Sequence, residues 1–258
     1  MIALFDSGIG GLTVLRSLVR RMPERDYLYM CDQAHFPYGG RPREDVRNDV
    51  SAFAAMAKRE GAEALVLACN TATAIGLEAA RQAFGPHAFG VVAPAATRAA
   101  AKTRSGCVGV LATRNTCETH AYRDAMNTRA CEVPCPELID LCEHGGASDE
   151  EVVRASEGPL AELRRAGSDI IVLGCTHLPV YEDILKTLTT PWAELLDPAE
   201  TLADELCAQL DARAESGHVE CRTTGDADMF MHRLQEELPQ VAQRARVSHI
   251  PVFGTENR

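Results

Sequence analysis

Two stretches of the sequence end a short apolar run on a cysteine, and the two cysteines stand 106 positions apart. Gly61–Thr71 reads GAEALVLACNT and Gly167–His177 reads GSDIIVLGCTH, with the glycine, the apolar run and the cysteine in the same register. Such runs are typical of strands buried in a parallel sheet. Because open α/β sheets bind ligands beyond the carboxyl ends of their strands, we expect Cys69 and Cys175 to lie at a ligand site.

The same offset recurs at a pair of hydroxyl residues. Ser7 follows a predicted strand at Ile2–Phe5, and Thr113 follows one at Cys107–Leu111, so each hydroxyl precedes its cysteine by 62 positions. An alternative is that βα units of similar length recur by chance and that cysteine is a common buried residue. The agreement of strand type, cysteine and hydroxyl favours an internal duplication.

A duplication of this kind predicts an α/β fold of two pseudo-symmetric parallel-sheet domains, with the active site in the cleft between them. Residues 1–94 together with 203–258 are expected to form the first domain, and residues 95–202 the second.

Several elements follow from the local pattern. Strands at Glu220–Thr224 and Val247–Ile250 are expected to extend the first sheet, and the helix before them is predicted at Ala199–Ala214. A loop is expected between a strand near Ala130–Val133 and a helix at Asp149–Ala166.

Composition excludes several classes of protein. The net charge of −11 argues against nucleic-acid binding, which usually needs a basic face. There is no apolar run long enough to span a membrane, and Met1 leads directly into a strand without the features of a signal peptide. We therefore expect a cytoplasmic protein with no membrane partner, whose ten cysteines are reduced.

No cofactor or metal is expected. The chain has three lysines, Lys58, Lys102 and Lys186, and each lies in a polar helical pattern. None of them is therefore evident as the Schiff-base lysine of a pyridoxal-phosphate enzyme. Cys131, Cys135 and Cys142 are the candidate zinc ligands. Their C-x-x-x-C spacing lacks the closer pair of cysteines or the nearby histidines of a zinc site, so it indicates one only weakly. The remaining cysteines are interpreted as packing residues: Cys31, Cys107, Cys117, Cys207 and Cys221.

Two thiols facing each other across a cleft can move a proton from one side of a carbon to the other. If each lies near a helix N-terminus that favours the thiolate, one can remove the proton while the other delivers one, which is racemisation by two bases. The developing charge needs fixed donors in a site that excludes water. Plausible donors are Asn70, Thr71, Thr113, Thr116 and Thr176.

Three further residues are candidates for setting the protonation of the thiols. Asp6 ends the strand expected beside that of Cys69, and His177 lies two residues beyond Cys175. Glu143 is a candidate acid on the second side. A lone histidine is more often structural, but the adjoining cysteine and the strand end favour a catalytic role.

Two loops are candidates for binding the rest of a small anionic ligand. The turn after the first strand carries Ser7 among glycines that let the backbone approach a ligand. A second loop holds Pro37, Tyr38 and Gly39, which together could form a preorganised carboxylate site. A turn that merely covers the sheet edge explains this second loop equally well.

With these motifs in order, the chain resembles the cofactor-independent glutamate racemases of the aspartate/glutamate racemase superfamily. The resemblance spans nearly the whole length and rests on five motifs: FDSGIGGLTVL at Phe5–Leu15, PYG at Pro37–Gly39, CNTA at Cys69–Ala72, GCTHLP at Gly174–Pro179 and TTGD at Thr223–Asp226.

This resemblance implies the two-domain fold, the two-thiol mechanism, a homodimer, and a supply of D-glutamate for peptidoglycan synthesis. It implies that Asp6 and His177 assist the cysteines and that Glu143 lies near Cys175. The amino acid's head would bind Ser7, Asn70, Thr71, Thr113 and Thr176, and its side-chain carboxylate would bind Pro37, Tyr38 and Gly39.

Two residues depart from the pattern of the family. His35 stands where relatives commonly have arginine, and His144 where a second acid is frequent, so aspartate or another acidic amino acid is the nearest alternative substrate. Two other classes of function remain as alternatives: a non-catalytic small-ligand binding protein, and a thiol redox or metal protein that uses Cys131 and Cys135.

Overall fold

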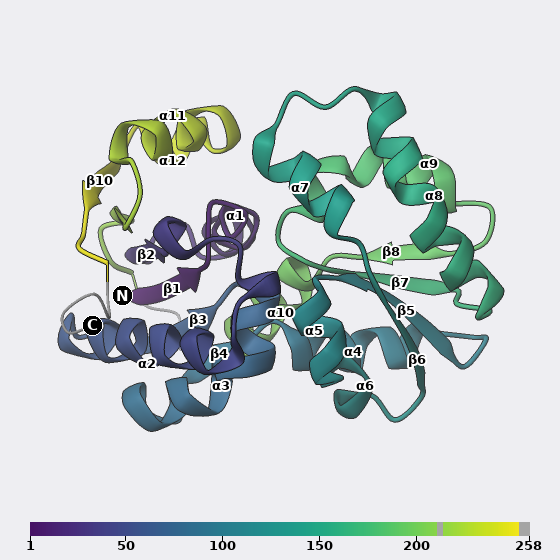
Figure 1. Cartoon of the computed structure of the whole chain (residues 1–258). Helices are drawn as coiled ribbons and strands as arrows, with labels where there is room; N and C mark the ends of the chain where they lie inside the picture. Colours follow the sequence, from purple (N-terminus) through teal and green to yellow (C-terminus); the bar gives the residue numbers. More distant parts are fainter. Residues whose placement is uncertain (211–213, 253–258) are drawn as a thin grey trace.

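The structure is a computed structural model that describes residues 1–210 and 214–252, apart from the side chains of Glu143 and His144. It contains two parallel sheets that lie side by side (Figure 1). The first has the strand order β10-β9-β2-β1-β3-β4 and the second β6-β5-β7-β8. The strands are β1 Ile2–Asp6, β2 Tyr27–Cys31, β3 Ala64–Leu67, β4 Ala88–Gly90, β5 Cys107–Ala112, β6 Arg129–Pro134, β7 Ile170–Gly174, β8 Glu194–Leu196, β9 Val219–Thr223 and β10 Ala245–His249.

The two sheets repeat one strand arrangement. The order β2-β1-β3-β4 in the first sheet reappears as β6-β5-β7-β8 in the second. The register also repeats, because Ile2 pairs with Ala64 and Val108 pairs with Ile170, each residue being shifted by the same 106 positions. The predicted fold class, two related parallel-sheet α/β units, is confirmed.

Helices surround both sheets and join them. They are α1 Leu12–Arg21, α2 Arg43–Arg59, α3 Asn70–Phe84, α4 Val92–Lys102, α5 Arg114–Thr119, α6 Ala121–Ala125, α7 Pro136–His144, α8 Asp149–Arg165, α9 Glu182–Thr189, α10 Pro198–Gln209, α11 Ala227–Glu237 and α12 Pro239–Ala242. Helix α10 packs on both α1 and α4. The expected division points at residues 94 and 202 fall inside α4 and α10, so the exact domain ranges stay a prediction.

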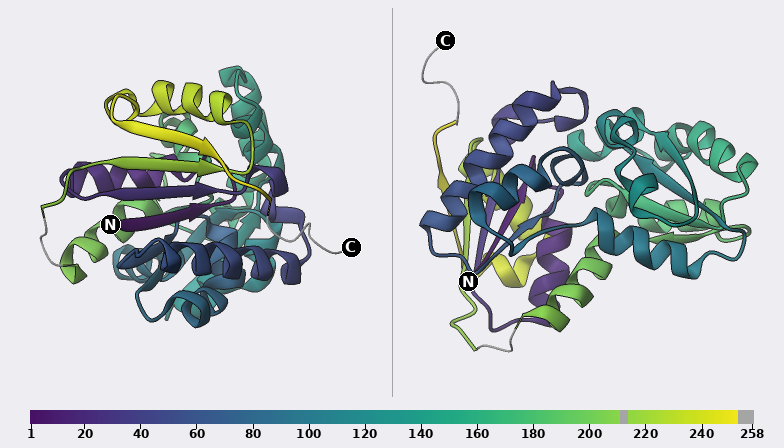
Figure 2. Two further views of the ribbon diagram at one scale, coloured as in Figure 1. Left: turned by 90° about the vertical axis from the view of Figure 1, so that its left-hand side faces the viewer. Right: turned by 90° about the horizontal axis from the view of Figure 1, so that it is seen from below.

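The C-terminal segment returns to the first sheet as expected. Strand β9 pairs with β2, and β10 pairs with β9, both in parallel (Figure 2). Phe230 of α11 is fully buried, and its ring centroid lies 5.7 Å from that of Tyr29 on β2. The segment therefore belongs to the core of the first unit.

Several local predictions were wrong. The expected loop between β6 and α8 contains helix α7, which begins at Pro136 and buries Leu138 and Ile139. Nine residues are too few for the helical period to be read with certainty in a single sequence. Helix α12 was also not predicted.

Helix α10 ends at Gln209, earlier than predicted, and Cys207 on this helix is exposed rather than packed. Four of the five cysteines interpreted as packing residues are buried: Cys31, Cys107, Cys117 and Cys221. Within the described ranges, no helix is both long and apolar enough to cross a bilayer.

We predict that the C-terminal segment contributes to stability through Phe230. Replacing Phe230 by Ala should lower the free energy of unfolding by about 3–5 kcal/mol, because it leaves a cavity against Tyr29. Its neighbour Met229 is 59% exposed, so Met229→Ala should change that free energy by less than about 0.5 kcal/mol. Urea unfolding of both variants measures the difference, and equal effects would contradict this account.

Candidate active site

The residues of the repeat, Ser7, Cys69, Thr113 and Cys175, follow strands β1, β3, β5 and β7 at the edges where the two units meet. Cys69 caps the N-terminus of α3, where its Sγ accepts a hydrogen bond from the backbone N–H of Ala72 at 3.4 Å. Ser7, at the end of β1, has its Oγ 3.4 Å from Cys69 Sγ. Thr113 caps α5 in the corresponding place on the second sheet, with its Oγ1 accepting from the N–H of Thr116 at 3.2 Å.

The second cysteine meets the first sheet through its neighbours. Cys175 Sγ lies 3.6 Å from Nδ1 of His177. Between them, Thr176 donates from its Oγ1 to Asp6 Oδ1 at 3.5 Å. A Cβ atom at Gly10 would come within 2.6 Å of Thr176 Oγ1, so this close approach of the two loops requires glycine. The ends of β1 and β7 are therefore in direct contact.

Three threonine hydroxyls form a triangle across the two units. Thr71 Oγ1 of α3 lies 2.9 Å from Thr113 Oγ1 and 3.1 Å from Thr116 Oγ1, and the latter two are 3.0 Å apart. Each hydroxyl has a rotatable proton and two lone pairs, so all three can turn their protons toward an anion. The structure thus brings together three of the predicted donors.

Asn70 is also buried, but part of its amide is already used. Its Oδ1 accepts a hydrogen bond from the hydroxyl of Tyr122 at 2.6 Å. Sequence reasoning missed Tyr122, because the 52 positions between the two residues leave no local signal. The amide nitrogen of Asn70 is the part that can act as the predicted donor.

Burial controls the protonation of both thiols. Burial first, and the negative charge of Asp6 second, raise the pKa of Cys69 to about 11, against the hydrogen bonds from Ser7 and Ala72. Burial raises the pKa of Cys175 well above its ordinary value, and the charge of Cys69 adds to the shift. The backbone N–H groups of Ala72 and His177 do favour the thiolates, as expected of Cys69 at its helix N-terminus, but desolvation outweighs them in the free protein.

The loop with Pro37, Tyr38 and Gly39 is tied to the first sheet through Asp32. The hydroxyl of Tyr38 donates to Asp32 Oδ2 at 2.7 Å, and Thr224 Oγ1 donates to Asp32 Oδ1 at 2.9 Å. Because the hydroxyl proton of Tyr38 is used in this way, its backbone is the part left to contact a ligand.

One cluster in this loop has the composition of a metal site. Asp32, His35 and Asp49 have ligand atoms within 4.8 Å of one another. Protein donors already occupy both carboxylates, because Arg41 pairs with Asp49 and Tyr38 bonds to Asp32. In the described part of the chain, no similar gathering of ligand atoms involves Cys131 and Cys135.

Glu143 lies in the last turn of α7, and its side chain is outside the described part of the structure, as is that of His144.

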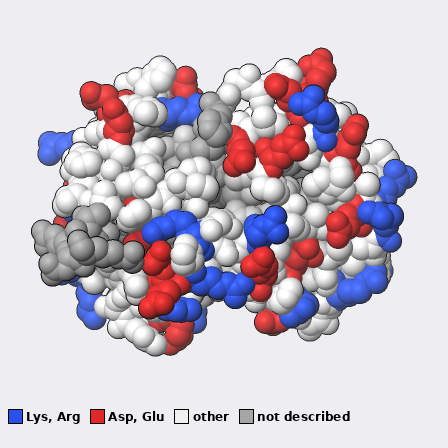
Figure 3. Space-filling model, viewed as in Figure 1, with Lys and Arg blue, Asp and Glu red and all other residues white. Residues whose placement is uncertain are grey.

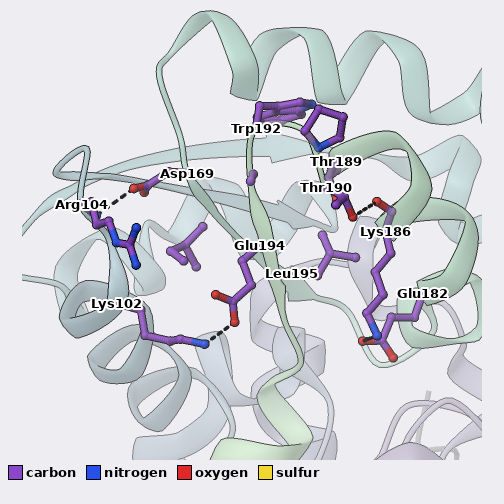
Figure 4. Close-up of a pocket in the computed structure, with 13 residues that line it drawn as sticks. Lys102, Arg104, Asp169, Glu182, Lys186, Thr189, Thr190, Trp192, Glu194 and Leu195 are labelled. Atoms are coloured by element: carbon purple, nitrogen blue, oxygen red, sulfur yellow. Dashed lines mark hydrogen bonds and ion pairs between the residues drawn. The ribbon is translucent and has the colours of Figure 1, made fainter.

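A cavity of about 760 Å³ lies elsewhere, at the amino end of the second sheet (Figure 4). It is lined by Ile170, the first residue of the strand whose far end leads to Cys175. Its lysines are paired with acids, Lys102 with Glu194 and Lys186 with Glu182. Its position at the wrong end of the strands argues against an active site there.

Charged side chains of both signs are interspersed on the face shown in Figure 3.

Comparisons with known proteins show the family and the fold of this chain. A family model for the Asp/Glu/hydantoin racemases matches residues 7–206. A glutamate racemase of Roseiflexus sp. is 37% identical over 257 residues, covering 94% of each chain. Among solved structures, glutamate racemase isoform RacE1 from Bacillus anthracis superposes with a TM-score of 0.90 at 29% identity, covering 98% of this chain and 97% of the other.

A second solved structure carries ligands. Escherichia coli glutamate racemase in complex with L-glutamate and the activator UDP-MurNAc-ala has a TM-score of 0.77 at 29% identity, covering 98% of this chain and 99% of that one. The matched family model covers the strand ends of both sheets, including Ser7, Cys69, Thr113 and Cys175. The chain belongs to the Asp/Glu/hydantoin racemase family.

Proposed function

We propose that this protein is a cofactor-independent glutamate racemase, which interconverts L- and D-glutamate with Cys69 and Cys175 as the two bases. The observation that carries the proposal is the repeat: two buried thiols follow equivalent strands, β3 and β7, that pair with β1 and β5 in the same register. The similarity to glutamate racemases along nearly the full length supports glutamate as the substrate.

The reaction needs one thiolate and one thiol at a time. The thiolate takes the α-proton and becomes a thiol, while the opposite thiol gives its proton to the other face of the carbon and becomes a thiolate. The two protonation states are exchanged after each turnover, which leaves the site ready for the reverse reaction.

The raised pKa of Cys69 suits this role once substrate is bound. A thiolate whose conjugate acid has a pKa of about 11 is a stronger base than an ordinary one. The ammonium group of the amino acid would bring a positive charge next to the sulfur and favour the thiolate. The free protein would then hold its thiols protonated and protected until substrate arrives.

We assign supporting roles to the surrounding residues. Asp6 and His177 set the protonation of Cys69 and Cys175, and Glu143 acts on the side of Cys175. The α-carboxylate and ammonium groups bind Ser7, Asn70, Thr71, Thr113, Thr116 and Thr176. The side-chain carboxylate binds at the turn of Pro37, Tyr38 and Gly39, where Tyr38 and Gly39 donate their backbone N–H groups and Pro37, which has no N–H, shapes the approach.

The proposal extends to the cellular role. The resemblance to the family supports a homodimer in the cytoplasm that supplies D-glutamate for peptidoglycan synthesis. Circular dichroism of purified protein with each enantiomer of glutamate and of aspartate tests activity and substrate together. Turnover of aspartate alone would overturn glutamate as the substrate.

Replacing either thiol should separate proton exchange from inversion. Cys69→Ser and Cys175→Ser should each lower racemisation by at least about 100-fold, because a serine hydroxyl is a far weaker acid than a thiol. The remaining thiol can still remove and return a proton on its own face, so one enantiomer should exchange its α-hydrogen in heavy water without inverting. NMR and chiral chromatography measure the two processes.

Cys207→Ser is the matched control, because Cys207 is exposed on α10. It should keep full activity. Full two-way racemisation by either Cys69→Ser or Cys175→Ser would refute the two-thiol mechanism.

The charge of Asp6 should be measurable in the titration of Cys69. Asp6→Asn removes a negative charge that raises the pKa of Cys69, so this pKa should fall below about 11 and the thiolate fraction at pH 8 should rise. Alkylation of the Cys69 peptide by iodoacetamide, followed by mass spectrometry across pH, should be faster in the variant.

Cys117 serves as the internal control, because its pKa of about 12 is raised by burial and by Glu132 rather than by Asp6. An unchanged Cys69 profile in Asp6→Asn would remove Asp6 from the account of this thiol.

A further inference from the structure

We infer that Asn115 is a positioning residue that holds the Tyr38–Arg41 turn against the start of α5 and so fixes where the substrate's side-chain carboxylate binds. This inference rests on the proposed function and adds to it a residue that lies outside the motifs of the sequence. Helix α5 lies at the junction of the two units (Figure 1).

The contact is made by one buried side chain. Nδ2 of Asn115 donates to the carbonyl oxygens of Tyr38 and Arg41, both at 2.8 Å, and the residue is only 7% exposed. Two carbonyl acceptors define the orientation of the amide, since a reversed amide would place its oxygen against two other oxygens. Both N–H groups of Asn115 are therefore used to hold the turn.

Among the described residues, the turn makes few other contacts with the second unit. It consists of the 3₁₀ turn η2, Tyr38–Gly40, followed by Arg41, whose N–H donates to Tyr38 O at 3.3 Å. Gly39 packs directly on the α5 cap, because a Cβ atom there would lie 2.7 Å from Thr113 Cβ. An ion pair between Arg43 and Glu118 also spans the two units, but both side chains are about half exposed and such pairs contribute little.

The opposite side of the turn is fixed to the first unit. Arg41 pairs with Asp49 and lies 5.4 Å from the centroid of the Tyr38 ring, while the Tyr38 hydroxyl bonds to Asp32. Asn115 supplies the corresponding attachment to the second unit. The turn is thus held between the two units rather than by either one alone.

This arrangement sets the distance between two proposed subsites. Asn115 follows Thr113 by two positions and immediately precedes Thr116, the hydroxyl residues proposed to bind the head of the amino acid. Its amide reaches from that helical turn to the backbone proposed to bind the side-chain carboxylate. Loss of the amide should therefore weaken binding of glutamate while leaving the thiols in place.

The test compares Asn115→Ala and Asn115→Leu with Glu118→Gln, a control on the same helix that breaks the exposed Arg43 pair. Both Asn115 variants should raise KM for L-glutamate by about tenfold, as expected for the loss of two buried hydrogen bonds, with kcat changed by less than about threefold. Asn115→Leu fills a similar volume but offers no N–H and adds no charge, so a similar loss in this variant separates hydrogen bonding from packing. Glu118→Gln should leave both constants within about twofold of the wild type.

The wild-type protein is assayed in parallel for α-hydrogen exchange of glutamate in heavy water. No exchange in the wild type would refute the proposed function, and this inference with it. Exchange in the wild type, together with an unchanged KM or a loss confined to kcat in the Asn115 variants, would overturn the inference alone. If Asn115→Ala fails to fold, the Asn115→Leu variant, which leaves no cavity, decides the question by the same criteria.

Discussion

The structure depends on the parallel pairing of β1 with β3 and of β5 with β7. In both sheets the first strand of the unit pairs with the strand that leads to a cysteine, and the two pairings have the same register. Parallel strands end at the same edge of their sheet. Ser7 and Cys69 therefore lie together at this edge of the first sheet, and Thr113 and Cys175 at the same edge of the second. The hydrogen-bonded ladders, which are fully buried, thereby fix the positions of these four side chains.

Contacts between the two units bring these two edges together. Thr176 bonds to Asp6, the threonine triangle joins α3 to α5, and Asn115 holds the Tyr38–Arg41 turn. All of these contacts are polar and lie in regions of low exposure, where a hydrogen bond is strong and an unpaired group is costly. The junction of the two edges is consequently specified by polar contacts, whereas apolar residues specify the sheets.

The same burial explains the state of the thiols. Removing sulfur from water disfavours the thiolate more than the cap N–H groups favour it, so the pKa of each cysteine rises. A buried thiol of this kind ionises less readily, and its thiolate, once formed, is a stronger base. The charge of Asp6 raises the pKa of Cys69 as well. The same carboxylate accepts a hydrogen bond from Thr176 and so joins the first unit to the second.

The sequence by itself determined the main strands and the repeat with its two cysteines, because apolar runs and a fixed offset between motifs can be read directly from the order of residues. It did not reveal α7, whose few apolar positions carry too short a period. Nor did it reveal that Tyr122 bonds to Asn70, that Thr224 bonds to Asp32, or that Asn115 holds a turn more than 70 positions away. Only the tertiary structure decided these contacts and the protonation of the thiols, because each depends on which distant groups share a buried space from which water is excluded.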